Sequence, residues 1–480
     1  MKKNKLFDLS NREQVNIESI SKNDIAIIGI AGQLPMASDV DTFWENLIGG
    51  VDCIRDFPDH RKKEVFDYFQ SKGVSANADE VEFKKKAYLD SIDQFDYNFF
   101  GLSHKEACLM NPSQRLFLET TWHLFEASGY SPESLRGSNT GLFIGHASSN
   151  NYLNLIEEME PEYVGMAYAS NLPSVIGSRI SYLLDFKGPS ILFDTACSSS
   201  MTALHMACQS IKNGECEQAI VGGVNLSLIP IQEQGEGLGI ISKHNKTRTF
   251  DDSSDGTVGG EGCLSIFIKP LAKAVDDKDK IWAVIKGSAS NNDGASAGIT
   301  APNSRAQEEV LIKAWENAKI KPENISYIEA HGTGTTLGDP IEIEGLTRAF
   351  EKYTDKKQFC AIGSVKTNVG HLNSISGLAG IVKAALSLNY KQIPALLHFE
   401  RPNRKIDFIN SPVYVNDVLK NWDSDSDQKR LCGVSSFGLS GTNCHVVLEE
   451  APLVKKTTTE RSKFILPLSA KSEKALTDIL

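Results

Sequence analysis

One stretch of the chain, residues 189–214, has the pattern of a strand that turns directly into a helix. The apolar run between Pro189 and Phe193 predicts a short buried strand. Apolar residues then recur at spacings of three and four, which predicts a helix packed on one face and ended by Asn213-Gly214. These positions are Met201, Leu204, Ala207, Cys208 and Ile211. A strand joined to a helix in this way is the building unit of layered α/β folds.

Cys197 lies at the turn of this unit. Its sulfur is expected close to the unpaired N–H groups at the helix start, which favour an anion. The position therefore predicts a lowered thiol pKa and a nucleophilic thiolate. A buried cysteine with a purely structural role fits the same turn, because free cysteines are often core residues. The turn alone leaves both interpretations open.

The composition is that of an ordinary soluble globular protein, with 41% hydrophobic and 23% charged residues. The net charge of −11 argues against nucleic acid as the main partner, because phosphate binding needs a basic face. A local basic patch for an acidic carrier remains open. No apolar run approaches the length of a membrane span, so no membrane association is predicted.

The nine cysteines show no C-x-x-C spacing, so the sequence predicts neither a zinc site nor a redox pair. Their odd number fits a reducing compartment. The start at Met1-Lys2-Lys3 is basic but is followed by polar residues, unlike a secretory signal. We therefore predict a cytoplasmic protein.

Strand and helix patterns alternate along most of the chain and predict a layered α/β architecture. Expected helices include one ended by Gly49-Gly50, one from Pro112 to Gly129 and one over 172–184. The stretch from Cys53 to Asp96 is charged and irregular. Expected buried strands are 25–32, 140–145, 219–224, 263–268, 281–285 and 325–330.

Composition also suggests how the chain is divided. Residues 1–21 are polar and are expected to form an arm, and residue 281 begins a second half. Residues 451–480 are expected to be the start of a linker within a longer polypeptide. No internal repeat is visible by residue identity.

Two histidines are expected at the ends of strands. His331 follows the strand predicted at 325–330, where open α/β sheets usually place ligands. His371 lies between a strand and a helix. A lone histidine is more often structural than catalytic. Two of them at similar strand ends, with Cys197 at a third, favour a common site.

The segment after His331 is rich in glycine. Gly332, Gly334 and Gly338 are one residue too widely spaced for a dinucleotide loop, and no G-K-[ST] follows, so a nucleotide site is not favoured. Asp339 before Pro340 predicts a helix cap with proline at the first helical position.

A further glycine-rich turn, residues 433–443, precedes the apolar strand predicted at 445–448. Small residues flank Leu439 and Ser440, so backbone N–H groups can approach a ligand closely. That arrangement suits an oxyanion hole. An ordinary tight turn explains the segment equally well when it is considered alone.

Together these stretches resemble the ketosynthase family of the thiolase superfamily, specifically ketosynthase domains of modular polyketide synthases. The similarity extends over residues 22–450, with halves of about 22–270 and 280–450. The matching motifs are D-T-A-C-S-S-S at 194–200, E-A-H-G-T-G-T-x-x-G-D-P-I-E at 329–342, K-T-N-V-G-H at 366–371 and S-S-F-G-L-S-G-T-N at 435–443.

The resemblance implies a duplicated, five-layered α/β/α/β/α thiolase-like fold and a homodimer. It implies Cys197, His331 and His371 as the catalytic triad, with Lys366 in a supporting position. Backbone N–H groups of Cys197 and Leu439 would form the oxyanion hole. Residues matched to phosphopantetheine or substrate contacts are Thr333, Thr335, Asn368 and Phe437.

Three details concern the subfamily. Fatty-acid ketosynthases carry glutamate nine residues after the second histidine, whereas this chain has Gly380, as polyketide enzymes do. The run at 338–346 is most similar to synthases served by a separate (trans) acyltransferase. Asn111 departs from the family, since relatives usually have aspartate before this proline.

The implied reaction is a decarboxylative Claisen condensation of an acyl chain on Cys197 with malonyl-acyl carrier protein in polyketide chain elongation. Substrates would travel on the phosphopantetheine of acyl carrier proteins, with no metal and no bound cofactor. Other polyketide synthase domains of the same polypeptide would be partners. The alternative is a non-elongating ketosynthase that acts as an acyl-transfer gatekeeper or acyl-binding scaffold. The presence of both His331 and Cys197 favours condensation.

Overall fold

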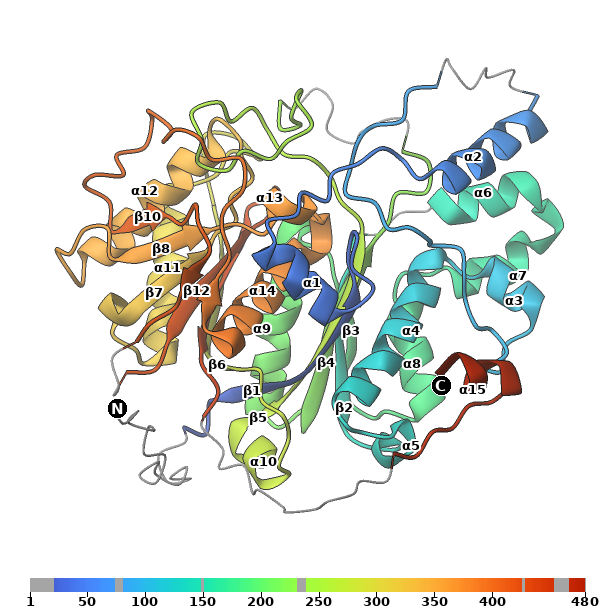
Figure 1. The fold of residues 1–480 in the computed structure, drawn as a ribbon. Coiled ribbons are helices and arrows are strands. Elements are labelled where there is room, and N and C mark those ends of the chain that lie inside the picture. The colour runs from blue at the N-terminus through green and yellow to red at the C-terminus, as the bar shows by residue number, and fades with distance from the viewer. Residues whose placement is uncertain are drawn as a thin grey trace, which may run out of the picture.

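A long mixed β-sheet forms the frame of the protein (Figure 1). The computed structural model describes residues 21–73, 81–147, 151–230, 239–424, 428–452 and 466–479. Eleven strands pair in the order β10-β8-β7-β12-β13-β6-β1-β5-β4-β2-β3. They are β1 (Ile25–Gln33), β2 (Thr140–Gly145), β3 (Ser190–Phe193), β4 (Gln218–Asn225), β5 (Gly262–Pro270), β6 (Ala283–Asn292), β7 (Ile325–Glu329), β8 (Cys360–Gly363), β10 (Val413–Val415), β12 (Leu431–Phe437) and β13 (Thr442–Glu449).

The two halves of this sheet have the same topology. In the first half, β1 pairs antiparallel with β5 and β5 with β4, after which β2 and β3 follow in parallel. In the second half, β6 pairs antiparallel with β13 and β13 with β12, after which β7 and β8 follow in parallel. A short antiparallel pairing of β1 with β6 joins the halves. The fold is therefore duplicated, as predicted.

Helices fill five layers together with the two half-sheets. α9 (Ser199–Lys212) and α14 (Ser376–Tyr390) pack on each other between the half-sheets. α4 (Pro112–Ala127) and α8 (Val175–Leu184) cover the outer face of the first half. α11 (Ser304–Ala318) packs on β6 and β13 of the second half and on α12 (Gly338–Glu351). The α/β/α/β/α prediction is confirmed.

Burial explains the sequence pattern of these elements. Strands covered on both faces are continuous apolar runs rather than alternating ones, and β1, β2, β4 and β5 are buried over nearly their whole length. The central helix α14 is buried on all sides and is apolar over most of its length. Asn111 caps α4, since its side chain accepts a hydrogen bond from the N–H of Ser113. The unusual asparagine thus performs the cap function of an aspartate.

The remaining elements are short or peripheral. β9 and β11 form a separate two-stranded sheet. The other elements are α1 (Val40–Ile48), α2 (Asp59–Ser71), α3 (His104–Leu109), α5 (Pro132–Leu135), α6 (Asn151–Met159), α7 (Val164–Ser170), α10 (Leu271–Asp276), α13 (Lys366–Val369), α15 (Glu473–Ile479), β9 (Gln392–Ile393) and β11 (Lys420–Asn421), with 3-10 helices η2 (Pro161–Tyr163), η3 (Ala196–Ser198), η4 (Pro322–Asn324) and η5 (Asn373–Ile375).

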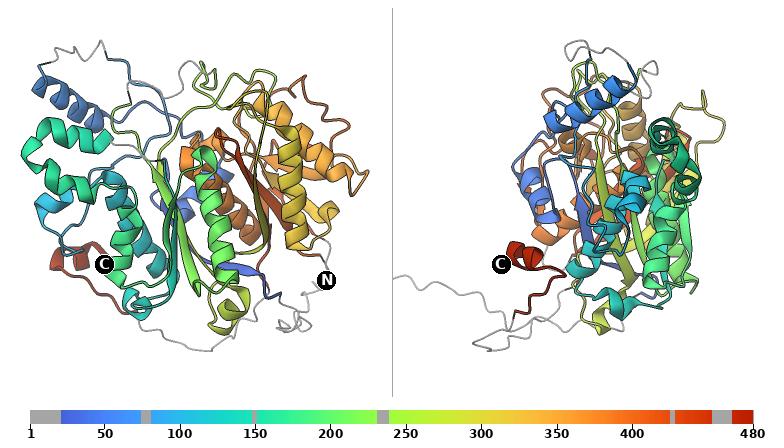
Figure 2. Two further views of the ribbon diagram at one scale, coloured as in Figure 1. Left: turned by 180° about the vertical axis from the view of Figure 1, so that it is seen from behind. Right: turned by 90° about the vertical axis from the view of Figure 1, so that its right-hand side faces the viewer.

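The C-terminal segment returns to the first half of the protein, beside α4 and α5 (Figure 2). Lys471 donates from Nζ to the carbonyl of Phe99 (2.7 Å) and lies over its ring. The arm predicted at 1–21 and much of the linker predicted at 451–480 lie outside the described residues. Among the residues that the structure places, no helix is long and apolar enough to cross a membrane.

Two expectations about local structure were wrong. The stretch from Cys53 to Asp96 contains the helix α2, which was missed because only Arg61 and Val65 of it are buried. A periodic apolar signal is therefore absent. The strand β3 is not buried but lies at the edge of the sheet, with Ile191 43% exposed.

A buried ion pair fastens α2 to the rest of the protein. The guanidinium of Arg61 binds both carboxylate oxygens of Glu261 (2.7 and 2.9 Å) and the carbonyls of Leu89 and Ser227. Glu261 in turn accepts the N–H groups of Leu89 and Ser227. The guanidinium and the carboxylate thus each take part in four hydrogen bonds inside the protein, which is the condition under which a buried pair persists.

We expect Arg61→Met to lower the free energy of unfolding by about 3–5 kcal/mol, because Glu261 would stay buried without its partner. Chemical denaturation of the folded protein measures this loss. Asp59→Asn is the control, because it removes the solvent-exposed pair with Lys62 and should change stability by less than about 1 kcal/mol. Equal effects of the two variants would contradict the role of the buried pair.

Candidate active site

The structure brings four distant segments together. Cys197 lies in η3 between β3 and α9, His331 follows β7, and His371 follows α13. The ring centroids of His331 and His371 are 5.8 Å apart, and the ring of Phe437 lies 5.8 Å from that of His331. Ser436, next to Phe437, donates from Oγ to the carbonyl of Cys197 (3.0 Å). The predicted residues thus share one site between the half-sheets.

The turn that carries Cys197 is held by its neighbouring hydroxyl groups. Ala196 has a left-handed backbone conformation (φ 55°), which an alanine rarely adopts. The hydroxyl of Ser199 accepts the N–H of Thr195 (2.9 Å) and donates to the carbonyl of Ala196 (2.6 Å). Ser198 donates to the carbonyl of Thr195 (2.9 Å). The serines therefore shape the turn.

A glycine lets the opposite turn approach the turn that carries Cys197. A Cβ atom on Gly438 would lie 2.3 Å from the carbonyl oxygen of Thr195 and 2.7 Å from Oγ of Ser198. No side chain fits in that space. The turn between β12 and β13 therefore reaches Cys197 only because position 438 is glycine, and Leu439 follows directly.

The pKa of Cys197 is raised, contrary to the sequence-based prediction. Burial of the sulfur is the largest cause, because a thiolate loses its hydration there. The N–H of Leu439, the charge of Lys366 and the N–H of Cys197 itself lower the pKa, in that order, but do not compensate for burial. The prediction considered only the helix start and did not include the lost hydration.

His371 is held in one neutral form. Its Nδ1 accepts the backbone N–H of Asn373 (2.9 Å), which can only donate, so Nδ1 carries no proton. The hydroxyl of Ser376 lies 2.9 Å from the same atom. Burial, with a smaller effect of Lys366, lowers the pKa of His371 to about 3. The proton of the neutral ring is therefore on Nε2, which makes Nε2–H a hydrogen-bond donor.

The backbone of His331 is fixed from both sides. Its N–H donates to Oε1 of Glu342 (2.8 Å), and its carbonyl accepts the Nζ of Lys366. The N–H of Gly332 donates to the other carboxylate oxygen of Glu342 (2.8 Å). Burial lowers the pKa of His331 well below its usual range, and the nearby Lys366 and His371 add to this effect. His331 is therefore neutral as well.

Two buried acids of the site were not predicted in these roles. Asp339 is not the expected cap, because α12 already begins at Gly338, and its carboxylate accepts the N–H groups of Gly334 (3.0 Å) and Phe250 (2.7 Å). Burial raises the pKa of Asp339 to about 7 and that of Glu342 to about 6. Their spacing of three residues on one helix face was the available sequence signal.

Three of the four residues matched to substrate contacts line this region. The hydroxyls of Thr333 and Thr335 are 3.2 Å apart and half-buried, and Phe437 packs beside His331. Asn368 differs, since its Nδ2 donates to the carbonyl of Val51 (3.1 Å). Its side chain therefore anchors the segment after α1.

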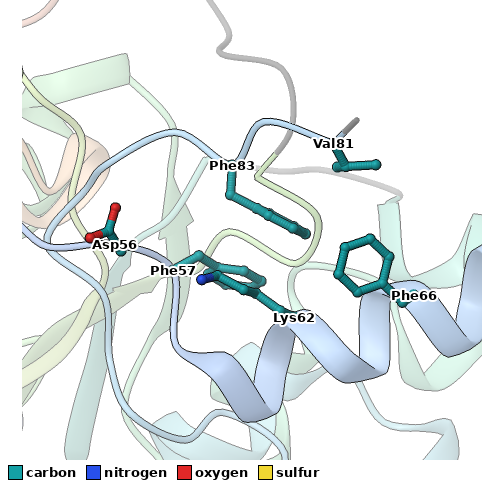
Figure 3. A pocket seen from close by; sticks show the side chains of 6 residues that line it. All are labelled: Asp56, Phe57, Lys62, Phe66, Val81 and Phe83. Carbon is teal, nitrogen blue, oxygen red and sulfur yellow. The ribbon is translucent and has the colours of Figure 1, made fainter. Parts of the chain in front are cut away.

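A separate pocket lies at α2 (Figure 3), and none of the predicted site residues line it. Its wall is aromatic, with the rings of Phe57 and Phe83 stacked at 4.9 Å. The lining residues are Asp56, Phe57, Lys62, Phe66, Val81 and Phe83. Throughout the described parts of the chain, no three His, Cys, Asp or Glu side chains are grouped to hold a metal ion.

Models of known protein families match almost the whole chain. The N-terminal domain of beta-ketoacyl synthases matches residues 22–274, and the C-terminal domain matches residues 282–400. The ketoacyl-synthetase C-terminal extension matches residues 402–480. The N-terminal domain alone accounts for more than half of the chain.

Individual relatives agree with these matches. Polyketide synthase PksL of Bacillus subtilis is 40% identical over 494 residues, which cover 99% of this chain and 11% of the relative. The chain thus spans about a tenth of that relative's length. A ketosynthase from module 6 of the bacillaene synthase of Bacillus subtilis 168 has a TM-score of 0.82 at 39% identity, covering 95% of this chain and 75% of that one. Ketosynthase twelve of the Bacillus amyloliquefaciens bacillaene polyketide synthase has a TM-score of 0.84 at 36% identity, covering 95% and 79%.

The charge of Lys366 predicts how fast Cys197 reacts. We expect Lys366→Met to slow alkylation of Cys197 at neutral pH by about tenfold, because the variant loses a charge that favours the thiolate. Because burial raises the pKa of the thiol, the parent rate should keep increasing with pH above 9.0, the ordinary thiol value. Peptide mass spectrometry after iodoacetamide treatment measures the rate. The exposed Cys108 is an internal reference, and an unchanged Cys197 rate in Lys366→Met would contradict the assignment.

Proposed function

Because the chain belongs to the beta-ketoacyl synthase family, we propose that it condenses a Cys197-bound acyl chain with a malonyl group in polyketide elongation. The observation that carries this proposal is the pair of neutral imidazoles of His331 and His371, 5.8 Å apart, which share the neighbouring charge of Lys366 with Cys197. A hydrolase would need a histidine whose unprotonated nitrogen accepts the proton of the nucleophile. On His371 that nitrogen is Nδ1, which already accepts the N–H of Asn373, so its Nε2–H is left to stabilise an enolate oxygen.

In the first half-reaction, the Cys197 thiolate attacks the carbonyl carbon of an acyl thioester. The bond to the carrier sulfur breaks, and the carrier leaves as its thiolate while the acyl group stays on Sγ. The N–H groups of Cys197 and Leu439 would hold the oxyanion, since both already interact with the sulfur in the resting site. Lys366 supports this step by favouring the thiolate.

In the second half-reaction, a malonyl thioester loses carbon dioxide. The electron pair of the broken C–C bond moves into an enolate, whose oxygen would be held by His331 and the Nε2–H of His371. The enolate carbon attacks the acyl carbonyl on Cys197, and the thiolate leaves. The product is a β-ketoacyl thioester. This chemistry requires no metal and no redox cofactor.

Carrier proteins are the partners that such substrates require. We propose that phosphopantetheine of an acyl carrier protein enters past Thr333 and Thr335, whose paired hydroxyls can bind an amide, and that Phe437 lines the route. Asn368 would contribute indirectly, through the segment that it anchors. We also propose that a separate acyltransferase serves this domain. The domain would be part of a cytoplasmic polypeptide that carries other polyketide synthase domains.

The domain limits are also a proposal. Residues 22–450 would form the ketosynthase domain, with halves of about 22–270 and 280–450, and 451–480 the start of a linker. The support is that β1 to β5 and β6 to β13 repeat one topology within these limits. Residues 1–21 would be an arm.

The two half-reactions can be separated experimentally. We expect His331→Ala to retain acylation of Cys197 but to lose condensation by about 10²–10³-fold, because one enolate donor is removed. Intact mass measures loading from an acyl thioester, and mass of the carrier-bound product measures elongation with malonyl carrier. Cys197→Ala is the control and should lose loading.

Each contrary outcome has a distinct meaning. Elongation by His331→Ala at the parent rate would refute the role of His331, and loading of Cys197→Ala would refute the nucleophile. Loading by the parent without elongation of any offered chain would favour the gatekeeper alternative.

The homodimer is supported by the edge strand β3. One side of β3 pairs with β2, while the other is at the end of the sheet. Apolar side chains are exposed around it, with Ile191 43% and Tyr182 of α8 90% exposed. A free edge with apolar neighbours invites pairing with another strand. We propose that two copies join through this edge.

We expect the parent to behave in solution as a dimer of twice 52.6 kDa. Ile191→Asp with Tyr182→Asp should give a monomer, because both introduce charge into the apolar contact. Light scattering after size exclusion measures the mass. Ile299→Asp, at a 91% exposed residue of the loop after β6, is the control and should stay dimeric. A dimer that survives the double change would exclude this edge.

A further inference from the structure

A fully buried ion pair lies next to the site. Nζ of Lys383 on α14 is 2.9 Å from Oε2 of Glu329, and the two side chains are 0% and 1% exposed. Glu329 also accepts the hydroxyl of Tyr327 (2.5 Å) and the N–H of Val365 (2.5 Å). Removing two charges from water is costly. The condensation steps above use neither residue.

Glu329 connects the two segments that carry His331 and Lys366. It is the last residue of β7, two positions before His331. Its Oε1 binds the N–H of Val365, the residue before Lys366. Lys366 closes the link by donating to the carbonyl of His331. One carboxylate therefore fixes the end of β7 against the start of α13.

The neighbouring helix is shaped to admit this carboxylate. A Cβ atom on Gly380 of α14 would lie 3.1 Å from Cγ of Glu329 and 3.2 Å from Val434. Lys383 is three residues further along α14 and so lies on the same face. The glycine leaves space for Glu329, and the lysine supplies the opposite charge.

The charges around Lys366 show what this pair accomplishes. Lys366 is buried, and three acids lie around it. Burial lowers the pKa of Lys366, and among the three acids, which oppose this change, Glu329 has the largest effect. All three acids accept backbone N–H groups, but among them only Glu329 is also paired with a second lysine, Lys383. The groups that face Lys366 are Glu329 and His331 around the end of β7, Asp339 and Glu342 on α12, His371 after α13, and Cys197 on η3.

We propose that Glu329 and Lys383 are positioning residues for the nucleophile: their ion pair aligns His331 with Lys366 and keeps Glu329 from neutralising the Lys366 charge that acts on Cys197. The inference rests on the proposed roles of Cys197 and Lys366. Without Lys383, the carboxylate is left with Lys366 as its nearest cation, and the thiolate loses support. Without the carboxylate, both lysines favour the thiolate.

The test is the rate at which iodoacetamide alkylates Cys197 at neutral pH and across a pH series, in the full chain without substrate. Lys383→Met should slow the reaction by about tenfold, and Glu329→Gln should accelerate it by a similar factor. The double variant should return to within about threefold of the parent, since both charges are removed together. Lys383→Arg should retain the parent rate.

Controls separate positioning from plain stability. Thermal unfolding confirms that each variant is folded, and Lys391→Met, at the exposed end of α14, should react like the parent. Loss of stability with an unchanged pH profile, or shifts of the same sign in both single variants, would overturn the inference. Alkylation of Cys197 requires no condensation. A negative result in the alkylation test therefore does not contradict elongation by the parent, and a negative elongation assay does not contradict the inference about Glu329 and Lys383.

Discussion

Exclusion of water from the site is the constraint on which the rest of the structure depends. It raises the pKa of the Cys197 thiol and lowers that of both histidines, so the resting site favours neutral groups. A neutral imidazole can donate a hydrogen bond to a developing enolate without being consumed as an acid. Lys366 then has to supply the positive charge that the thiolate needs. The buried acids around Lys366 accept hydrogen bonds from backbone N–H groups, and Glu329 also pairs with Lys383. These interactions leave the charge of Lys366 available to the thiolate.

Duplication explains why the site lies where it does. Since β3 corresponds to β8 in the repeated topology, Cys197 before α9 and His371 before α14 occupy equivalent turns in the two halves. His331 lies two residues after β7, while the equivalent turn after β2 carries His146, which corresponds to Ala330 and is bonded through Nδ1 to the carbonyl of Val224. The two halves have thus diverged at the same place in the fold: one carries Cys197, and the other carries His331 and His371.

Much of this was visible in the sequence. Continuous apolar runs predicted β1, β2, β4, β5 and β7, because strands buried on both faces are apolar at successive positions rather than at every second one. The three turns with Cys197, His331 and His371 were predicted as one site, and the structure brings them together. The repeat itself was not visible by residue identity, because the two halves keep the same backbone topology while their amino-acid residues differ. It could be expected only from the family resemblance.

What the sequence could not supply is information about burial in three dimensions. A helix start lowers a thiol pKa, but whether desolvation outweighs it depends on the β12–β13 turn, which lies more than two hundred residues away and approaches through Gly438. The same holds for Glu329, whose motif position says nothing about a lysine arriving from α14. β3 was predicted as buried because its residues are apolar, yet it is the end of the sheet. The apolar residues of β3 are those of a buried strand, and they can be buried only if a second surface covers this edge. The exposure of β3 in a single copy of the chain is therefore an argument for association through that edge.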